Sequence, residues 1–223
     1  MKYLGHVITS DGIKPDPDLI KAVKEFPKPT KIKDVQSFLG LTGYYRRFIK
    51  NYAKIAEPLI RQLRFSSSKN HHLQWTDDCT KAFNILKDKL TAEPIMSTPN
   101  FDQPFILELD ACEYGLGAIL TQEYDDKKYV IAYASRTLST IERKYGDTER
   151  EALAIVWATK HFRSYIEGSK VLIRSDCKAL EWMRNAKDVT GRLARWAMKL
   201  SAFQIENIQY RPGKQNANAD ALS

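Results

Sequence analysis

Four acidic residues in the second half of the chain each stand alone beside an apolar stretch instead of lying in a charge run. They are Asp110, Glu151, Asp176 and Asp220. Carboxylates gathered in one place repel one another unless a divalent cation lies between them, and Mg²⁺ prefers such hard oxygen ligands. Two such ions roughly 3.5 to 4 Å apart can activate a water and stabilise the leaving oxygen in phosphodiester hydrolysis. The set therefore predicts a metal-dependent hydrolytic site, although each acid taken singly also fits a cap or surface position.

The elements around these acids predict how a fold gathers them. Alternating or β-branched runs indicate strands, and 3.6-residue periodicity indicates helices. The expected strands are 105–110, 115–121, 128–135, 170–174 and 204–210, and the expected helices are 148–165, 179–184 and 191–203. Asp110 and Asp176 then close strands, Glu151 lies in the first turn of the long helix, and Asp220 follows a turn at Pro212 and Gly213. The order βββαβααβ predicts an α/β (α+β) fold with a mixed five-stranded sheet and packed helices.

The front of the chain has a different pattern. Residues 1–15 predict a short hairpin that turns at Ser10, Asp11 and Gly12. Helical signals follow, with Asp16 as an N-cap before Pro17 and Thr76 as the cap of a later helix. The polar stretch 65–72 indicates a loop. We expect a small helical domain at 1–95 and a second domain at 96–223.

The net charge of +8 is concentrated in the front half. Residues 1–100 hold 17 Lys or Arg against 10 Asp or Glu, and residues 101–223 hold 18 against 17. A basic excess of this kind favours a polyanionic partner such as nucleic acid, and a merely solvated basic surface is the equal alternative.

No apolar run approaches the roughly 20 residues that a membrane span needs, and the start lacks a signal-peptide pattern. Cys79, Cys112 and Cys177 are an odd number at no metal-like spacing, so reduced thiols are expected. We expect an intracellular, cytoplasmic protein.

The sequence Tyr124-Asp125-Asp126 resembles the metal site of a reverse-transcribing polymerase. It lies between two expected strands and is followed by two lysines, a composition typical of a polar hairpin turn. We therefore interpret it as a turn.

Six stretches together resemble one family. They are KYLGHVITSDGIKP, SFLGLTGYYRRFIKNYAKIAEPL, ACEYGLGAILTQ, YASRTLSTIERKYGDTEREALAIVWA, RSDCKALEW and YRPGKQNANADALS. In this order they resemble the thumb and ribonuclease H portions of the polyprotein of gypsy-type (Metaviridae) LTR retrotransposons. The resemblance covers nearly the whole chain. It implies a ribonuclease H-like fold preceded by a small helical thumb domain that begins at the last hairpin of the polymerase palm, and it implies no polymerase site.

The resemblance also assigns roles to residues. It implies that Asp110, Glu151, Asp176 and Asp220 are the catalytic metal ligands of a ribonuclease H that cleaves the RNA strand of RNA–DNA hybrids. Glu151 is preferred to Glu149, which points elsewhere on a helix. Two Mg²⁺ ions are the expected cofactor, with Mn²⁺ as the alternative. Cys112 and Cys177 stand where the family commonly has serine and histidine.

Basic and aromatic residues are expected to contact the nucleic acid. In the thumb these are Arg46, Arg47 and Lys50, beside Tyr44 and Tyr45, although Tyr45, Phe48 and Tyr52 also have the spacing of core residues. In the ribonuclease H domain Arg192, Arg195 and Lys199 form a second stripe, opposite Leu193, Trp196 and Leu200. Tyr210 occupies the region where cellular relatives carry a mobile histidine, and it completes the expected contacts.

The expected partners are an RNA–DNA hybrid or template–primer duplex, and the remainder of the reverse transcriptase or a second copy of this chain, within a virus-like particle context. The alternative function is a catalytically silent nucleic-acid-binding or scaffolding remnant of a retroelement. An integrase-type transferase is weaker, because its core has three carboxylates and no zinc-binding His/Cys array is present.

Overall fold

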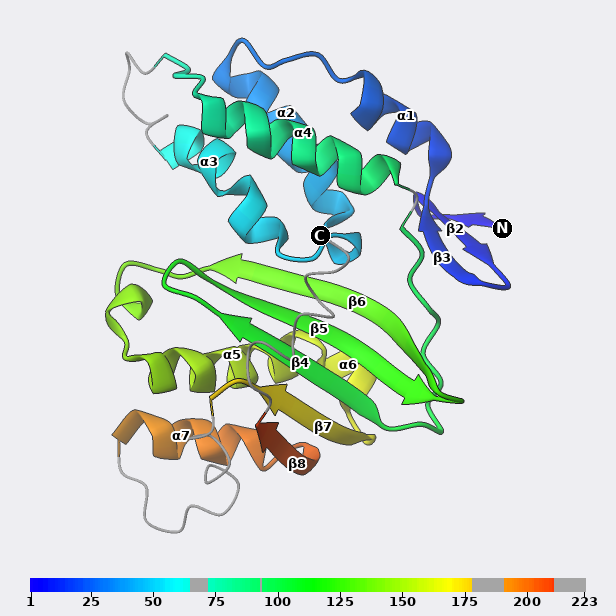
Figure 1. The fold of residues 1–223 in the computed structure, drawn as a ribbon, viewed down its shortest axis with the longest axis vertical. Coiled ribbons are helices and arrows are strands. Elements are labelled where there is room, and N and C mark those ends of the chain that lie inside the picture. The colour runs from blue at the N-terminus through cyan, green and yellow to red at the C-terminus, as the bar shows by residue number, and fades with distance from the viewer. Residues whose placement is uncertain (65–71, 93, 178–190, 211–223) are drawn as a thin grey trace. The chain divides into compact units, whose positions relative to one another are not determined.

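The protein is described by a computed structural model for residues 1–64, 72–92, 94–177 and 191–210 (Figure 1). The chain divides into two compact units. The first comprises residues 1–98 with 132–137, and the second comprises residues 99–131 with 138–223. The domain boundary that we expect near residue 95 remains a prediction. No helix in the described ranges is long and apolar enough to cross a membrane.

The first unit begins with a small antiparallel sheet. Its strands are β1 (Lys2–Tyr3), β2 (His6–Thr9) and β3 (Gly12–Pro15). The turn that leads into Gly12 matches the expected hairpin, whereas the turn at Leu4 and Gly5, which adds β1, was not expected. Gly12 has a φ of 138°, and a Cβ atom there would lie 2.3 Å from the carbonyl oxygen of Met96. Only glycine fits this position, where β3 bridges to the chain at Met96.

Helices make up most of the rest of the described first unit, which also includes the strand segment 132–137. They are α1 (Pro17–Glu25), α2 (Ile32–Tyr44), the 3₁₀ turn η1 (Arg46–Phe48), α3 (Tyr52–Arg64) and α4 (Asp77–Thr91). The expected caps are present, because Asp16 accepts a hydrogen bond from the Asp18 N–H and Thr76 accepts one from the Cys79 N–H. Tyr45, Phe48 and Tyr52 are buried, so their spacing does mark core residues.

The second unit is built on a five-stranded sheet, although residues 132–137 of its strand β6 are grouped with the first unit. Its strands are β4 (Phe105–Ala111), β5 (Gly115–Tyr124), β6 (Lys127–Thr137), β7 (Lys170–Ser175) and β8 (Gln204–Tyr210). They lie in the order β6-β5-β4-β7-β8. β4 pairs antiparallel with β5 but parallel with β7, and β7 pairs parallel with β8. The expected mixed sheet is confirmed.

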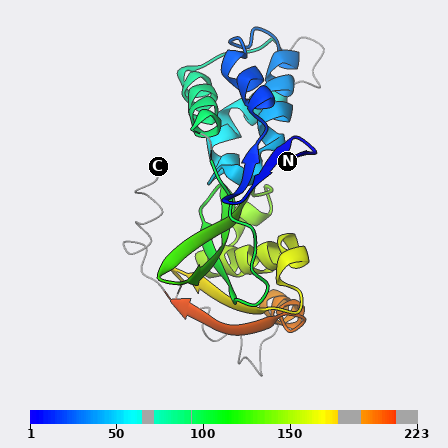
Figure 2. The same cartoon turned by 90° about the vertical axis from the view of Figure 1, so that its right-hand side faces the viewer.

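The described part of the second unit also contains three α-helices. They are α5 (Asp147–His161), α6 (Arg163–Ile166) and α7 (Gly191–Leu200). α5 packs on β4 and β5, and α7 packs on α5. Figure 2 shows the sheet from its side with α5 against one face. The buried residues of α5 include Ala152, Ile155 and Thr159, which recur at helical spacing.

Two helix ends differ from the expectation. The long helix was expected to reach Tyr165, but α5 ends at His161 and the separate α6 follows. Phe162 breaks the helical backbone with ψ of 14° and buries its ring, and no glycine or proline signals this break. α7 ends at Leu200 instead of Phe203. The expected loop at 65–72 lies almost wholly outside the described residues, and the expected helix 179–184 and the turn at Pro212 lie entirely outside them.

The Tyr124-Asp125-Asp126 sequence forms the β5–β6 turn, as we interpreted it. Asp125 and Asp126 have φ angles of 51° and 55°. Two successive left-handed residues are typical of the two-residue type I′ hairpin turn, which favours Asn-Gly. The rings of Tyr124 and Tyr129 stack beside it with centroids 4.2 Å apart.

We therefore predict that the double variant Asp125→Asn/Asp126→Gly stabilises the protein. The free energy of unfolding should rise by about 0.5 to 1 kcal/mol, because Asn and Gly adopt left-handed backbone with less strain. Urea unfolding of the variant and the parent chain measures the difference. A free energy of unfolding that is unchanged or lower in this variant would contradict the prediction.

Candidate active site

Three neighbouring parallel strands end at one edge of the sheet. The β4–β7 pairing matches Phe105 with Val171 and Glu108 with Arg174, a constant offset of 66 residues. Asp110 is the next-to-last residue of β4 and Asp176 directly follows the last residue of β7, and neighbouring strands are about 4.8 Å apart. β8 extends the edge, because Tyr210 is the register partner of Ser175 and is exposed. The two aspartates that we predicted from sequence therefore lie on adjacent strand ends, and both are exposed.

Glu151 projects from the first turns of α5 toward the same edge. Its side chain is buried, and its Oε2 accepts a hydrogen bond of 3.2 Å from Ser175 Oγ. The Ala111 backbone N–H also donates to this carboxylate. Ala111 and Ser175 are the residues next to Asp110 and Asp176, so the same two strand ends that present the aspartates also hold the glutamate.

The three carboxylates interact electrostatically. Burial raises the pKa of Glu151 to about 7, and the negative charges of Asp176 and, more weakly, Asp110 act in the same direction. The hydrogen bonds from Ser175 and the Ala111 N–H oppose this rise in pKa. Glu151 thus carries a charge that its surroundings disfavour, which is the situation that a bound cation relieves.

The described residues provide no counter-charge inside this cluster. No ion pair joins Lys, Arg or His to Asp110, Glu151 or Asp176 within the part of the chain that the structure describes. Over the same residues, no group of three or more His, Cys, Asp or Glu has its side chains converged as metal ligands. The donor chemistry is that of hard carboxylate oxygens, which suits Mg²⁺ or Mn²⁺.

Other predicted acids have different placements. Asp220 lies outside the described residues, so its role as a fourth ligand stays a prediction. Glu149 turns away from the cluster, as helical geometry predicts: it accepts a bond from the Gly146 N–H at the start of α5 and forms an ion pair with Arg192, N to O 2.9 Å.

The predicted nucleic-acid-binding residues of α7 divide into two groups. Arg192 is half-buried, pairs with Glu149 and lies over the Tyr145 ring at 4.0 Å, so it attaches α7 to the start of α5. Arg195 and Lys199 are exposed, while Trp196 and Leu200 on the other side are buried. The expected amphipathic stripe is therefore present, but Arg192 already has partners within the chain.

The basic residues of the first unit lie in and after η1. Arg46 is exposed with its guanidinium over the Tyr52 ring at 5.6 Å, and Arg47 and Lys50 are half-buried. Tyr44 is exposed, and its neighbour Tyr45 is in the core. Contact of these cations with nucleic acid remains a prediction.

Sequence reasoning missed two parts of this region. Ser175 orients Glu151, and the only available signal was a serine directly before Asp176. Arg174 and Glu108, which precede the two aspartates by two residues each, form a buried ion pair with N to O 3.5 Å. Pairs of this kind depend on strand register, which a single sequence does not reveal.

Comparison with known proteins places these features in a family. Residues 75–173 match the model of an RNase H-like domain found in reverse transcriptase. The chain is 43% identical over 225 residues to the retrovirus-related Pol polyprotein from transposon 297 of Drosophila melanogaster, covering 99% of this chain and 20% of that protein. It is 36% identical to the corresponding polyprotein from transposon gypsy of the same organism, covering 100% of this chain and 22% of that protein.

Solved structures share the fold. The foamy viral protease-reverse transcriptase in complex with RNA/DNA hybrid has a TM-score of 0.77 at 20% identity, covering 95% of this chain and 29% of that one. The same enzyme in complex with dsDNA has a TM-score of 0.73 at 20% identity, covering 95% and 44%. This likeness confirms the ribonuclease H-like fold class. The chain spans about one fifth of the length of the curated relatives it matches, and its homologues are retrovirus-related Pol polyproteins of transposons that include gypsy, with an RNase H-like domain found in reverse transcriptase.

Proposed function

We propose that this chain is a metal-dependent endoribonuclease that hydrolyses the RNA strand of RNA–DNA hybrids. The observation that carries the proposal is the parallel pairing of β4 with β7, which end at Ala111 and just before Asp176, with the charges of Asp110 and Asp176 both acting on the buried Glu151. The RNase H-like family match supports a nuclease fold, and a foamy viral enzyme of similar fold was solved with an RNA/DNA hybrid.

Each acid would have its own part in holding the ions. Asp110 and Asp176 offer exposed oxygens at the strand ends, where a substrate phosphate has access. Glu151 offers a buried oxygen whose direction is set by Ser175 and the Ala111 N–H. Two divalent ions bound there would supply activation of the attacking water and stabilisation of the leaving oxygen. Asp220 remains the proposed fourth ligand.

The duplex would be held by charges outside the acid cluster. Arg195 and Lys199 project from the exposed side of α7, and Tyr210 is exposed at the end of β8, next to the strand that leads to Asp176. Arginine and lysine pair with backbone phosphates and fix the position of a duplex without reading its sequence. A hybrid differs from DNA in its 2′-hydroxyls, which the site must recognise to select the RNA strand.

The first test replaces one ligand. Asp110→Asn should reduce hybrid cleavage by roughly a thousandfold or more, because several kcal/mol of transition-state stabilisation depend on the ions. Binding of the hybrid, measured by fluorescence anisotropy, should change little. Asp126→Asn in the β5–β6 turn is the matched control and should cleave like the parent chain. Undiminished cleavage by Asp110→Asn would refute the site, and binding without cleavage by the parent chain would favour the remnant function.

A second prediction concerns metal-free stability. Because the folded-state pKa of Glu151 is raised to about 7 from 4.5, the folded protein binds this proton more tightly than the unfolded chain does. This tighter proton binding adds to the free energy of unfolding. Its contribution is fully present below pH 4.5 and is lost as the pH rises through 7. The loss should be on the order of 3 kcal/mol between pH 4.5 and 8.

Urea unfolding in EDTA at pH 5 and pH 8 checks this prediction. The Glu151→Gln variant should lack the pH dependence of stability that Glu151 causes. Its free energy of unfolding at pH 8 should be higher than that of the parent chain. Glu113→Gln, an exposed acid three residues after Asp110, controls for the loss of one negative charge. Equal pH dependence in the parent chain and Glu151→Gln would show that Glu151 titrates normally.

A third prediction concerns the duplex contacts. The double variant Arg195→Ala/Lys199→Ala should weaken hybrid binding and reduce the slope of log K against log salt by about one per phosphate contact removed. Folding should be unaffected, because both side chains are exposed. Lys160→Ala, an exposed lysine on α5, is the control. A salt slope equal to that of the parent chain would exclude α7 from the interface.

A further inference from the structure

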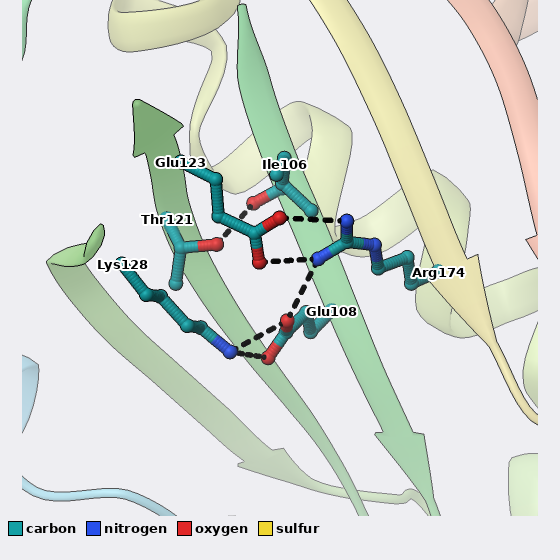
Figure 3. A network of polar contacts seen from close by, with 6 residues as sticks. All are labelled: Ile106, Glu108, Thr121, Glu123, Lys128 and Arg174. Atoms are coloured by element: carbon teal, nitrogen blue, oxygen red, sulfur yellow. Dashed lines mark hydrogen bonds and ion pairs between the residues drawn. The ribbon is translucent and has the colours of Figure 1, made fainter. Parts of the chain in front are cut away.

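Four charged side chains from four adjacent strands form a network on one face of the sheet (Figure 3). They are Glu108 of β4, Glu123 of β5, Lys128 of β6 and Arg174 of β7. Arg174 binds Glu123 through two bonds of 2.6 and 2.9 Å and lies 3.5 Å from Glu108. Lys128 Nζ is 2.7 Å from both oxygens of Glu108. Two cations are therefore balanced by two carboxylates.

The inner half of the network is buried, which makes its pairing important: Arg174 and Glu108 are buried, whereas Glu123 and Lys128 are exposed. Arg174 is 7% exposed and Glu108 is 9% exposed. Leaving one member of a buried charge pair without its partner is costly, so each charge must be balanced locally. Arg174 Nε still has no hydrogen-bond partner among the described residues, so this guanidinium retains an unused donor.

The network lies directly beside the acid cluster. Glu108 precedes Asp110 by two residues and Arg174 precedes Asp176 by two residues, and side chains two apart on a strand share a face. The separation along the strand is about 7 Å. Asp110 is therefore the next side chain of β4 along the face that carries Arg174, and Asp176 follows directly after the end of β7.

An arginine in this position competes with a metal ion for the carboxylates of Asp110 and Asp176. Guanidinium groups form strong bidentate pairs with carboxylates, and two exposed aspartates at the ends of the same two strands are available partners. In Figure 3 the Arg174 side chain instead extends across β4 to Glu123. The bidentate bond to Glu123 holds the guanidinium there.

We propose that Glu123 is a positioning residue that keeps the Arg174 guanidinium away from Asp176 and Asp110, so that these carboxylates stay available to a divalent cation. The inference rests on the proposed metal-binding role of the two aspartates. It gives a function to a glutamate that lies on a different strand from either aspartate.

Mn²⁺ binding to the full chain, followed by electron paramagnetic resonance, tests this inference without an activity assay. Glu123→Gln frees Arg174 and should raise the Kd for Mn²⁺ about tenfold. The double variant Glu123→Gln/Arg174→Met removes the competitor and should restore the Kd to within about twofold of the parent value. Glu167→Gln, which breaks the exposed Arg163 pair on α6, should leave the Kd unchanged.

A purely structural role for Glu123 predicts a different pattern. If the network only ties strands together, the double variant should bind Mn²⁺ as weakly as Glu123→Gln or more weakly, and this result would overturn the inference. Circular dichroism and urea unfolding establish that each variant is folded. Glu123→Asp, which keeps the charge but shortens its reach, is the second variant and should shift the Kd in the same direction by less.

Different results would contradict the proposed function and the role of Glu123. A parent chain that does not bind Mn²⁺ contradicts the proposed function. A parent chain that binds Mn²⁺ while Glu123→Gln binds it equally well contradicts only the role of Glu123.

Discussion

The parallel pairing of β4 with β7 is the constraint on which the rest of the second unit depends. Its constant offset of 66 residues aligns Glu108 with Arg174, and the same offset continued for two residues leads from Asp110 to Asp176, which directly follows β7. A slip of one residue would move all of these side chains to the opposite face. The ion pair and the acid pair are thus two consequences of one register, and the deletion or insertion of a single residue in either strand would remove both.

At the acid cluster, the arrangement that suits a bound cation lowers the stability of the metal-free protein. Glu151 is buried next to two aspartates, and its raised pKa reports that opposition. Only neutral donors, Ser175 Oγ and the Ala111 N–H, support its charge within the described residues. The neighbouring network shows the contrasting solution, in which every buried charge has an opposite charge beside it. The second unit therefore carries a balanced set of charges on one face of its sheet and, where β4 and β7 end, an unbalanced set suited to a cation.

Local patterns in the sequence were sufficient for much of this architecture. Alternation predicted the strands that end at Asp110 and precede Asp176, and helical spacing placed Glu151 and not Glu149 toward the sheet. The break at Phe162 was not predictable, because hydrophobic periodicity continues through it. The bond between Arg174 and Glu123 was also hidden, since the two residues are 51 positions apart and meet only across β4. Pairings of this kind follow from strand order and register, which local patterns do not fix.

The central claim is that the carboxylates at this sheet edge form a working nuclease site. The most direct measurement is cleavage of an end-labelled RNA–DNA hybrid by this chain, with and without Mg²⁺, beside RNA and DNA duplex controls. The account predicts that cleavage requires the metal and occurs only in the RNA strand of the hybrid. Cleavage that persists in EDTA, or that proceeds equally on a DNA duplex, would contradict it.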